Sequence, residues 1–363
     1  MKTLRELINI DSSENQEKII EYIKNKLKNN VSEIKIIKNK INEKLSLIVG
    51  INTKLSNISP MVLSGHIDTV PASITENINN PFVATTIKNK LYGLGSIDMK
   101  SFTAVVIDNI EELSRLEYPL IFTLSTDEET NLNCIETIIS NLKALDIKPK
   151  FTIVGEPTNS TFKLKSKGCY EYIVDFYGKT CHSSVPENGI NSICIASRLI
   201  TFIEETQINF DLTSNCAVIT GGEATNKVPE KTTLKFDIRS FDSEQVELFV
   251  KSINDKLKSL KTQYNGFEYK LQNTLKIPAF NNKNIKKLSK IIKIKETDNI
   301  VFTGGCEAGY FTNYSGDALI YGVGDLNLAH KPNEFVDIDE YKTYSKNLIK
   351  LIKKLSNYYQ KNR

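Results

Sequence analysis

The stretch Met61-Val62-Leu63-Ser64-Gly65-His66-Ile67-Asp68-Thr69-Val70-Pro71 sets the pattern of this chain. It opens on a short apolar run, which favours a buried strand, and continues into a histidine and an aspartate where that strand should end. Comparable apolar runs occur at residues 46–51, 120–124, 151–154 and 318–322. Segments with helical periodicity lie between them, at residues 101–113 and 135–145. Strands that alternate with helices predict an α/β fold, with a mostly parallel sheet covered by helices.

The pattern changes near residue 169. Residues 170–176 and 233–239 alternate between apolar and polar side chains, which is typical of antiparallel strands with one face in water. Helical segments accompany them at about residues 189–206 and 243–260. We therefore expect an inserted α+β domain of residues 169–273, within a first domain made of residues 1–168 and 274–363.

Two further helices are expected toward the ends of the chain. Near the start, Ser13 and Gln16 match a capping box, and the apolar residues that follow them fall on one helical face. Near the end, residues 337–359 form an amphipathic pattern that predicts a last helix on the first domain.

The composition is that of an ordinary globular protein. Of its 363 residues, 40% are hydrophobic and 25% are charged, and 47 basic residues nearly balance 43 acidic ones. The lysines are scattered over expected helix faces, which indicates solvated surface rather than binding to nucleic acid or a membrane. We find no apolar run of ~18 residues and no apolar h-region near residue 1. Six cysteines without a CxxC pair favour free thiols, so we expect a cytoplasmic protein.

The three histidines of the chain, His66, His182 and His330, stand in settings that suggest chemistry. Acidic residues occur between them where strands should end: Asp98, the pair Glu128-Glu129, and Glu156. The carboxyl ends of parallel strands meet at one edge of a sheet, so these groups can converge. Imidazole and carboxylate ligands suit a divalent ion, zinc first and cobalt or manganese next. The set predicts a hydrolase with two metal ions.

Each member of this set also has a simpler interpretation. His66 and Asp68 can form a hydrogen-bonded pair at a strand end, and Asp98 can cap a helix. Glu128-Glu129 can be a solvated loop, Glu156 before Pro157 a turn, and His330 a surface loop residue. The ordered combination, rather than any single residue, indicates the metal site.

The ordered set resembles the co-catalytic zinc amidohydrolases, a family that includes acetylornithine deacetylase, succinyl-diaminopimelate desuccinylase, aminoacylase and carboxypeptidase-type peptidases. The resemblance extends from residues 65–71 to Ala329-His330-Lys331-Pro332. It implies that His66 and Glu156 bind one metal ion, that Glu129 and His330 bind the other, and that Asp98 bridges both. It also implies a cis peptide bond after Asp98. Ser101 departs from the pattern, because many relatives have glycine there.

The same resemblance implies roles for other residues. Asp68 would orient His66, and Glu128 would be the general base and acid. The inserted domain would serve as lid and dimerisation domain, with His182 reaching the partner subunit's active site to stabilise the oxyanion. Residues that would contact the substrate or the oxyanion are Asn226, Arg239, Gly304, Gly305 and Glu307. Two alternatives stay open: Arg239 as a surface strand residue, and Glu307 as a loop acid that faces water.

The expected substrate is a small N-acyl amino acid. The segment Gly305-Cys306-Glu307-Ala308 is similar to one in acetylornithine deacetylases, whereas desuccinylases tend to carry a Ser-Asp type segment there. An acid at Glu307 would then face the ammonium group of a basic amino acid. We expect a homodimer that hydrolyses N2-acetyl-L-ornithine to ornithine and acetate, as in arginine biosynthesis. Succinyl-diaminopimelate, other acyl-amino acids and dipeptides remain alternative substrates, and a non-catalytic binding protein on the same fold is the remote alternative.

Overall fold

A computed structural model describes residues 1–40, 42–53, 58–72, 80–206, 211–282, 284–294 and 299–362. The contacts divide the chain into two compact units. Unit 1 comprises Met1–Lys165 and Phe280–Arg363, and unit 2 comprises Ser166–Ala279.

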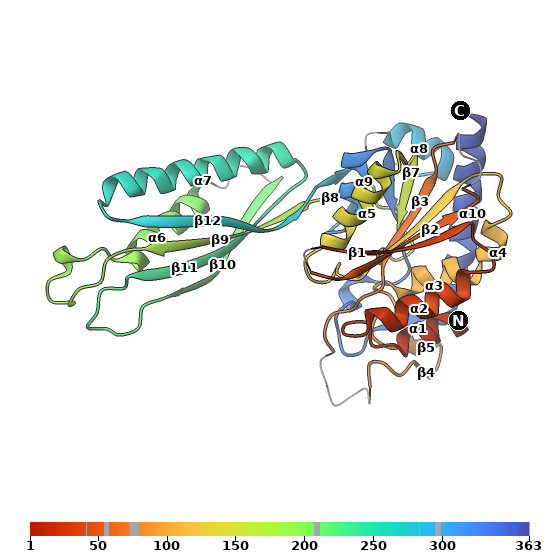
Figure 1. The fold of residues 1–363 in the computed structure, drawn as a ribbon, viewed down its shortest axis with the longest axis horizontal. Coiled ribbons are helices and arrows are strands. Elements are labelled where there is room, and N and C mark those ends of the chain that lie inside the picture. Colours follow the sequence, from red (N-terminus) through yellow and green to blue (C-terminus); the bar gives the residue numbers. More distant parts are fainter. Residues whose placement is uncertain are drawn as a thin grey trace. The chain divides into compact units, whose positions relative to one another are not determined.

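The central sheet of unit 1 is mainly parallel, which confirms the predicted fold class. Its strand order is β1-β2-β6-β3-β7-β15 (Figure 1). The strands are β1 (Glu33–Lys38), β2 (Leu45–Ile51), β3 (Met61–His66), β6 (Leu120–Ser125), β7 (Phe151–Val154) and β15 (Asp317–Ile320). β6, β3, β7 and β15 run parallel, whereas β1 and β2 pair antiparallel along one edge. The sequence analysis did not anticipate β1.

Helices cover both faces of this sheet. Successive residues of each strand point to opposite sides, so the buried strands present apolar side chains to both faces. On β15, Leu319 belongs to the core shared with α3 and α10, whereas Ile320 packs with Ala308 at the start of α9. The helices of unit 1 are α1 (Lys2–Ile8), α2 (Gln16–Leu27), α3 (Lys100–Asp108), α4 (Ile110–Leu113), α5 (Asn133–Ala144), α8 (Ile285–Ile292), α9 (Ala308–Tyr314) and α10 (Ile338–Lys361).

Smaller elements complete the described part of unit 1. One three-stranded sheet contains β4 (Thr85–Ile87), β5 (Lys90–Tyr92) and β16 (Phe335–Asp337). Another contains β8 (Lys165–Ser166), β13 (Phe280–Asn281) and β14 (Val301–Phe302). A short 3-10 helix, η2 (Leu326–Leu328), lies between β15 and β16.

Unit 2 is an antiparallel sheet with two helices on one face (Figure 1). The strand order is β10-β11-β9-β12. Its elements are β9 (Gly168–Tyr177), η1 (Pro186–Asn188), α6 (Ser192–Glu205), β10 (Leu212–Gly221), β11 (Lys231–Ser240), α7 (Ser243–Gln263) and β12 (Glu268–Ile277). Alternate residues of β11, such as Leu234 and Phe236, are buried against Leu199 of α6 and Ile253 of α7. The Asn191 side chain caps α6, accepting hydrogen bonds from two backbone N–H groups of its first turn.

The predicted capping box at Ser13 and Gln16 is wrong. Helix α2 begins at Gln16, and its N-cap residue, Asn15, makes no side-chain cap hydrogen bond. The Ser13 hydroxyl instead donates to Asp11 at 2.6 Å. The Gln16 side-chain oxygen accepts from Leu45 N–H at 3.0 Å and from the Thr126 hydroxyl at 2.8 Å. Gln16 therefore ties the helix to the central sheet instead of closing its own first turn.

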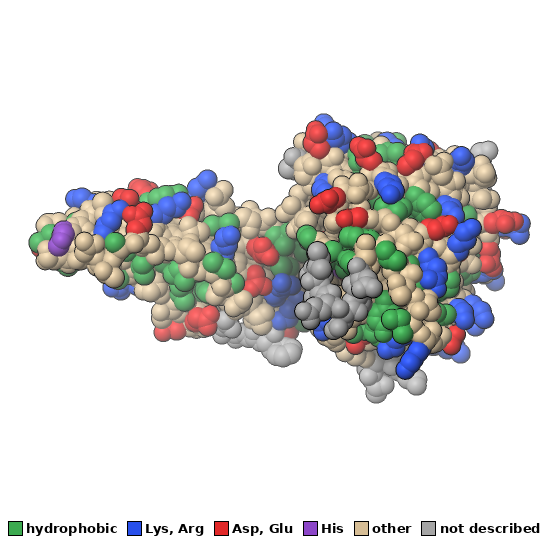
Figure 2. Space-filling view, turned by 90° about the horizontal axis from the view of Figure 1, so that it is seen from below, with side chains coloured by type: hydrophobic (Ala, Val, Ile, Leu, Met, Phe, Trp, Pro, Cys, Tyr) green, Lys and Arg blue, Asp and Glu red, His purple; other side chains and the backbone are tan. Residues whose placement is uncertain are grey.

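Charged side chains of both signs occur side by side over much of the face shown in Figure 2. Within the described ranges, no helix combines the length and the apolar character needed to cross a bilayer.

The close approach of Gly322 to the turn after β7 gives a test of the packing at the carboxyl end of the sheet. A Cβ atom at Gly322 would lie 2.1 Å from the Glu156 carbonyl oxygen and 2.4 Å from that of Gly155. Because both neighbours are backbone atoms, we expect Gly322→Ala to lower the free energy of unfolding by about 1–3 kcal/mol, measured by urea denaturation.

Gly50→Ala is a matched control for this substitution. The nearest described atoms to a Cβ atom there would be those of the Thr53 side chain, the first at 2.9 Å, and the end of that side chain can rotate away. Equal stability losses in the two variants would contradict the proposed backbone clash at Gly322.

Candidate functional site

Five of the predicted site residues lie at the carboxyl edge of the unit 1 sheet. His66 is the last residue of β3, Glu129 follows β6, and Glu156 follows β7. Asp98 precedes α3, and His330 follows η2. Ligand atoms of His66, Asp98 and Glu156 all lie within 4.8 Å of one another, and so do those of Asp98, Glu129 and His330. The fold thus brings the five predicted metal ligands together in two groups that share Asp98.

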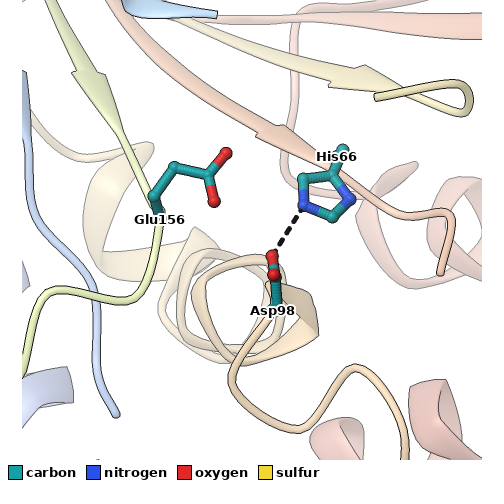
Figure 3. Close-up of side chains that lie close together, drawn as sticks. All are labelled: His66, Asp98 and Glu156. Carbon is teal, nitrogen blue, oxygen red and sulfur yellow. Dashed lines mark hydrogen bonds and ion pairs between the residues drawn. The ribbon is translucent and has the colours of Figure 1, made fainter. Parts of the chain in front are cut away.

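The first group is buried and closely spaced (Figure 3). His66 Nε2 lies 2.9 Å from Asp98 Oδ1, and Glu156 faces this pair from the end of β7. The other ring nitrogen of His66 lies 3.4 Å from Asp68 Oδ1 and 3.2 Å from the Asp68 carbonyl oxygen. A histidine that binds metal through one ring nitrogen commonly donates a hydrogen bond from the other to a carboxylate or a carbonyl oxygen. Nδ1 of His66 is placed for that bond, which leaves Nε2 for the metal.

The second group continues from the same aspartate. His330 Nε2 lies 3.4 Å from Asp98 Oδ2, and 3.0 and 2.9 Å from the two carboxylate oxygens of Glu129. Asp98 therefore turns one carboxylate oxygen toward His66 and the other toward His330. A carboxylate placed in this way is suited to bridge two cations.

Among the described residues, no lysine or arginine forms an ion pair with the carboxylates of this cluster. In the described part of the chain, the ion pairs of these carboxylates are with histidines only. Burial raises the pKa of Glu156 well above its usual value, and the Asp98 charge adds to the effect. Burial opposes ionisation of Asp98, but hydrogen bonds with His330 and His66 lower its pKa.

A divalent cation in each group fits these residues. Glu156 Oε1 is buried and finds no hydrogen-bond partner among the described residues, so it has an acceptor site to offer. A cation would supply that partner and the missing positive charge. Nitrogen and oxygen donors of this kind suit zinc, and also cobalt or manganese.

Glu128 follows β6 in a turn that Asp127 holds, and its charge interacts with members of both ligand groups. The Asp127 carboxylate is buried and accepts from Asn133 N–H at 3.0 Å, Cys134 N–H at 2.9 Å and the Asn42 side-chain amide at 2.8 Å. Desolvation raises the pKa of Glu128 well above its usual value, and the Glu156 charge adds to it. The sequence analysis missed Asp127, although an aspartate shortly before a helix is a recognised capping signal.

Asp68 connects the two groups, in addition to facing His66. Its second carboxylate oxygen, Oδ2, accepts from Glu129 N–H at 3.1 Å. One carboxylate therefore helps to fix a histidine of the first group and a glutamate of the second. This position accords with the orienting role that the sequence resemblance implied for Asp68.

The sequence offered two interpretations of Glu307, a contact with a substrate ammonium group or a loop acid facing water, and its position in the structure matches neither. It is 1% exposed, so the alternative of a loop acid facing water is wrong. Its two carboxylate oxygens accept from the Ser64 hydroxyl of β3 and the Ser125 hydroxyl of β6, each at 2.5 Å. The predicted contact with a substrate ammonium group gains no support from this placement. Gly304 and Gly305, in the same loop, are half-buried.

His182, Asn226 and Arg239 belong to unit 2. His182 is exposed, and its Nδ1 accepts from Ser184 N–H at 3.1 Å, which places the proton of the neutral ring on Nε2. Asn226 lies in the neighbouring turn, where its carbonyl oxygen accepts from Ser183 N–H at 3.1 Å. Arg239 projects from β11 and pairs with Asp237 at 2.8 Å, with its side chain 39% exposed. His182 thus keeps an N–H group available for donation.

The segment around Asp98 accommodates the unusual Ser101. The Asp98–Met99 peptide bond is cis, as the resemblance implied. Ser101 is buried, and its hydroxyl donates to the Ser96 carbonyl oxygen. The Ser101 hydroxyl therefore has a hydrogen-bond partner within this buried segment.

Comparison with known proteins fits this geometry. A family model described as Peptidase family M20/M25/M40 matches residues 62–354. The chain belongs to this family. It is therefore a metal-dependent hydrolase.

Several relatives within the family are acetylornithine deacetylases. That of Buchnera aphidicola subsp. Schizaphis graminum is 30% identical and covers 81% of this chain and 80% of its own length. That of Proteus mirabilis is 29% identical, with coverage of 78% and 76%. The chain is thus similar to these enzymes over most of its length.

Solved structures of the family share the fold. A tripeptidase from Staphylococcus aureus aligns with a TM-score of 0.78 at 22% identity, covering 98% of this chain and 97% of that one. A dinuclear metal-binding peptidase from Bacillus subtilis aligns with a TM-score of 0.71 at 15% identity, covering 98% and 97%. At these identities the likeness confirms the fold alone.

The burial of Glu307 predicts a pH dependence of stability. Burial raises the pKa of Glu307 to about 7, against the hydrogen bonds from the two serines, which lower it. The folded chain then keeps a proton that the unfolded chain has lost, so this carboxyl makes stability fall as pH rises from about 4.5 to about 7. In metal-free protein, we expect Glu307→Gln to remove up to about 3 kcal/mol of that decline, measured by urea denaturation across this range.

Glu111→Gln serves as the control, because Glu111 is an exposed carboxylate on α4. It should leave the pH profile of the wild type unchanged. A Glu307→Gln profile parallel to that of the wild type would show that Glu307 does not titrate in this way.

Proposed function

We propose that this protein hydrolyses the amide bond of an N-acyl amino acid, and that its substrate is N2-acetyl-L-ornithine, which yields ornithine and acetate. The observation that carries the reaction type is the Asp98 carboxylate, which turns one oxygen toward His66 and the other toward His330. Glu128, whose charge interacts with both ligand groups, adds a candidate base. The similarity to acetylornithine deacetylases over about four fifths of both chains supports the substrate.

The metal centre would consist of two divalent ions, zinc by preference, with cobalt or manganese able to substitute. We assign His66 and Glu156 to one ion, Glu129 and His330 to the other, and Asp98 to both. Ions bound in this way would lower the pKa of a water molecule and polarise the carbonyl group of the amide. Asp68 would keep the His66 ring oriented through Nδ1.

Glu128 would carry the proton. Its raised pKa, caused first by desolvation and then by the Glu156 charge, makes its carboxylate a better base than an exposed glutamate. It would take a proton from the attacking water and pass it to the nitrogen of the leaving amine. One residue thus serves as base in the first half of the reaction and as acid in the second.

The unit 2 residues would complete the site in a homodimer. The Nε2–H group of His182 would donate to the carbonyl oxygen as negative charge grows there, in the active site of the partner subunit. Arg239 offers a planar fork that matches a substrate carboxylate, and Asn226 offers an amide. The edge strand β10 supports a dimer through unit 2, because its Val218 and Ile219 side chains are exposed.

The substrate assignment rests on similarity more than on a particular contact, because Glu307 is turned into the protein. N-succinyl-diaminopimelate, other acyl-amino acids and dipeptides are therefore the competing substrates, and a non-catalytic binding role is the competing function. Glu128, in place beside both ligand groups, favours an enzyme over a binding protein.

A substrate panel tests the proposal directly. We expect chelator-treated protein, reloaded with zinc or cobalt, to release ornithine from N2-acetyl-L-ornithine faster than it cleaves N-succinyl-diaminopimelate, other acetyl-amino acids or a dipeptide. Glu128→Gln should lower turnover by about 10²–10⁴-fold while metal content stays at two ions per chain.

The two parts of this test fail separately. Faster cleavage of another compound in the panel would overturn the substrate. Normal turnover by Glu128→Gln would overturn its role as base. Failure to cleave any compound with two ions bound would favour the binding function.

Mixing inactive variants tests His182 and the dimer together. We expect His182→Ala and Glu128→Gln each to be inactive alone, because each lacks one group of every site. After subunit exchange, half of the dimers are mixed, and each mixed dimer regains one complete site. Activity should then rise to about a quarter of the wild-type value. No recovery in mixtures in which mass measurements show mixed dimers would exclude a role of His182 across the interface.

A further inference from the structure

Glu334 is a buried carboxylate near the metal site that no role above uses. It lies four residues after His330, between η2 and β16, and is 1% exposed. Its Oε1 atom accepts from Ile97 N–H at 2.8 Å, Asp98 N–H at 3.3 Å and the Ser96 hydroxyl at 3.4 Å. One carboxylate oxygen therefore gathers three donors of the short segment that carries Asp98.

The backbone around Glu334 is bound to the same part of the chain. Its carbonyl oxygen accepts from Gly93 N–H at 3.1 Å, and its own N–H donates to the Lys331 carbonyl oxygen at 3.0 Å. The next residues form β16, in which Phe335 pairs with Tyr92 of β5. The segment that supplies His330 is thereby fixed to the segment that leads to Asp98.

The second carboxylate oxygen of Glu334 indicates that this residue is not there for stability alone. Glu334 Oε2 is buried and has no hydrogen-bond partner among the described residues. A buried, half-satisfied carboxylate is costly, so a residue that is needed only for stability has cheaper replacements. The three side-chain hydrogen bonds described above all come from the short segment that ends in Asp98.

We propose that Glu334 is a positioning residue that holds the Asp98 segment in register with His330 and so sets the affinity of the protein for its divalent ions. This inference rests on the proposed metal centre. The Asp98 side chain is short, so a shift of its backbone moves both of its carboxylate oxygens. Because Asp98 belongs to both ligand groups, loss of the Glu334 carboxylate should weaken the binding of both ions. Partners of this kind, which hold metal ligands without touching the metal, typically change metal affinity by about 10–100-fold.

Metal titration of the full chain measures this effect without relying on activity. Zinc or cobalt is titrated into chelator-treated protein in competition with a chelating dye, at neutral pH. We expect Glu334→Ala to weaken binding of both ions by about 10–100-fold. Glu334→Gln keeps an amide oxygen that can accept from Ile97 and Asp98, so it should retain affinity within a few-fold of the wild type.

Asn282→Ala provides the matched control. Asn282 is also buried in unit 1, where its side chain donates to the Ala318 carbonyl oxygen at 2.7 Å and accepts from Asn284 N–H at 2.8 Å. This variant also loses buried hydrogen bonds to the backbone, but neither of them involves a predicted metal ligand. Its melting temperature should fall while its metal affinity stays at the wild-type level.

Three results would overturn this inference and leave the proposed metal centre standing. The first is wild-type metal affinity in Glu334→Ala, and the second is an equal loss of metal affinity in Glu334→Gln and Glu334→Ala. The third is a loss of metal affinity in Asn282→Ala that equals the loss in Glu334→Ala when the two variants have the same melting temperature. If Glu334→Ala does not fold, Glu334→Asp replaces it, because a carboxylate shortened by one methylene should reach the Asp98 segment poorly and lose affinity similarly. Absence of any divalent ion binding by the wild type would overturn the proposed metal centre itself, and this inference with it.

Discussion

The position of the Asp98 carboxylate between His66 and His330 is the constraint on which the rest of the site depends. Its two oxygens point to different histidines, at 2.9 and 3.4 Å, so a small shift of this one residue changes both ligand groups at once. Much of the surrounding structure restrains it. The Glu334 carboxylate accepts a hydrogen bond from the Asp98 backbone N–H. The cis peptide bond that follows Asp98 leads directly into α3.

Gathering this many acids at one edge of a sheet opposes folding unless positive charge is added. All the buried aspartates and glutamates among the described residues lie at or beside this cluster: Asp68, Asp98, Asp127, Glu156, Glu307 and Glu334. Some of them are satisfied by backbone N–H groups or hydroxyls, as Asp127 and Glu307 are. Among the ligands, Glu156 keeps a buried acceptor atom, Oε1, that has no hydrogen-bond partner in the described residues. Metal binding and the stability of unit 1 should therefore be coupled. The parallel strands provide the rigid frame on which that coupling acts.

Much of the fold could be predicted because it follows local rules. The apolar runs at β3, β6, β7 and β15 appear in the sequence as buried strands, and the alternation in β11 appears as a sheet with one buried face. Local sequence patterns gave a wrong prediction where a side chain forms hydrogen bonds with residues distant in the sequence. Gln16 matched a capping box, yet its oxygen serves Leu45 and Thr126. Such partners leave no periodic signal near the residue itself, and β1 was missed because its weaker run has only one buried residue.

The sequence was sufficient to predict the fold class and the four parallel strands of unit 1, and with the family resemblance it named five candidate metal ligands. It could do so because apolar periodicity reports burial directly, and because the carboxyl ends of parallel strands must meet at one edge of the sheet. Only the tertiary structure decided where each carboxylate points. Glu307 turns inward to two serines on neighbouring strands, and Glu334 bonds to Asp98 across 236 positions of sequence. The reason is physical: the direction of a side chain is set by the packing of segments far apart in the chain, and no local pattern of residues records it.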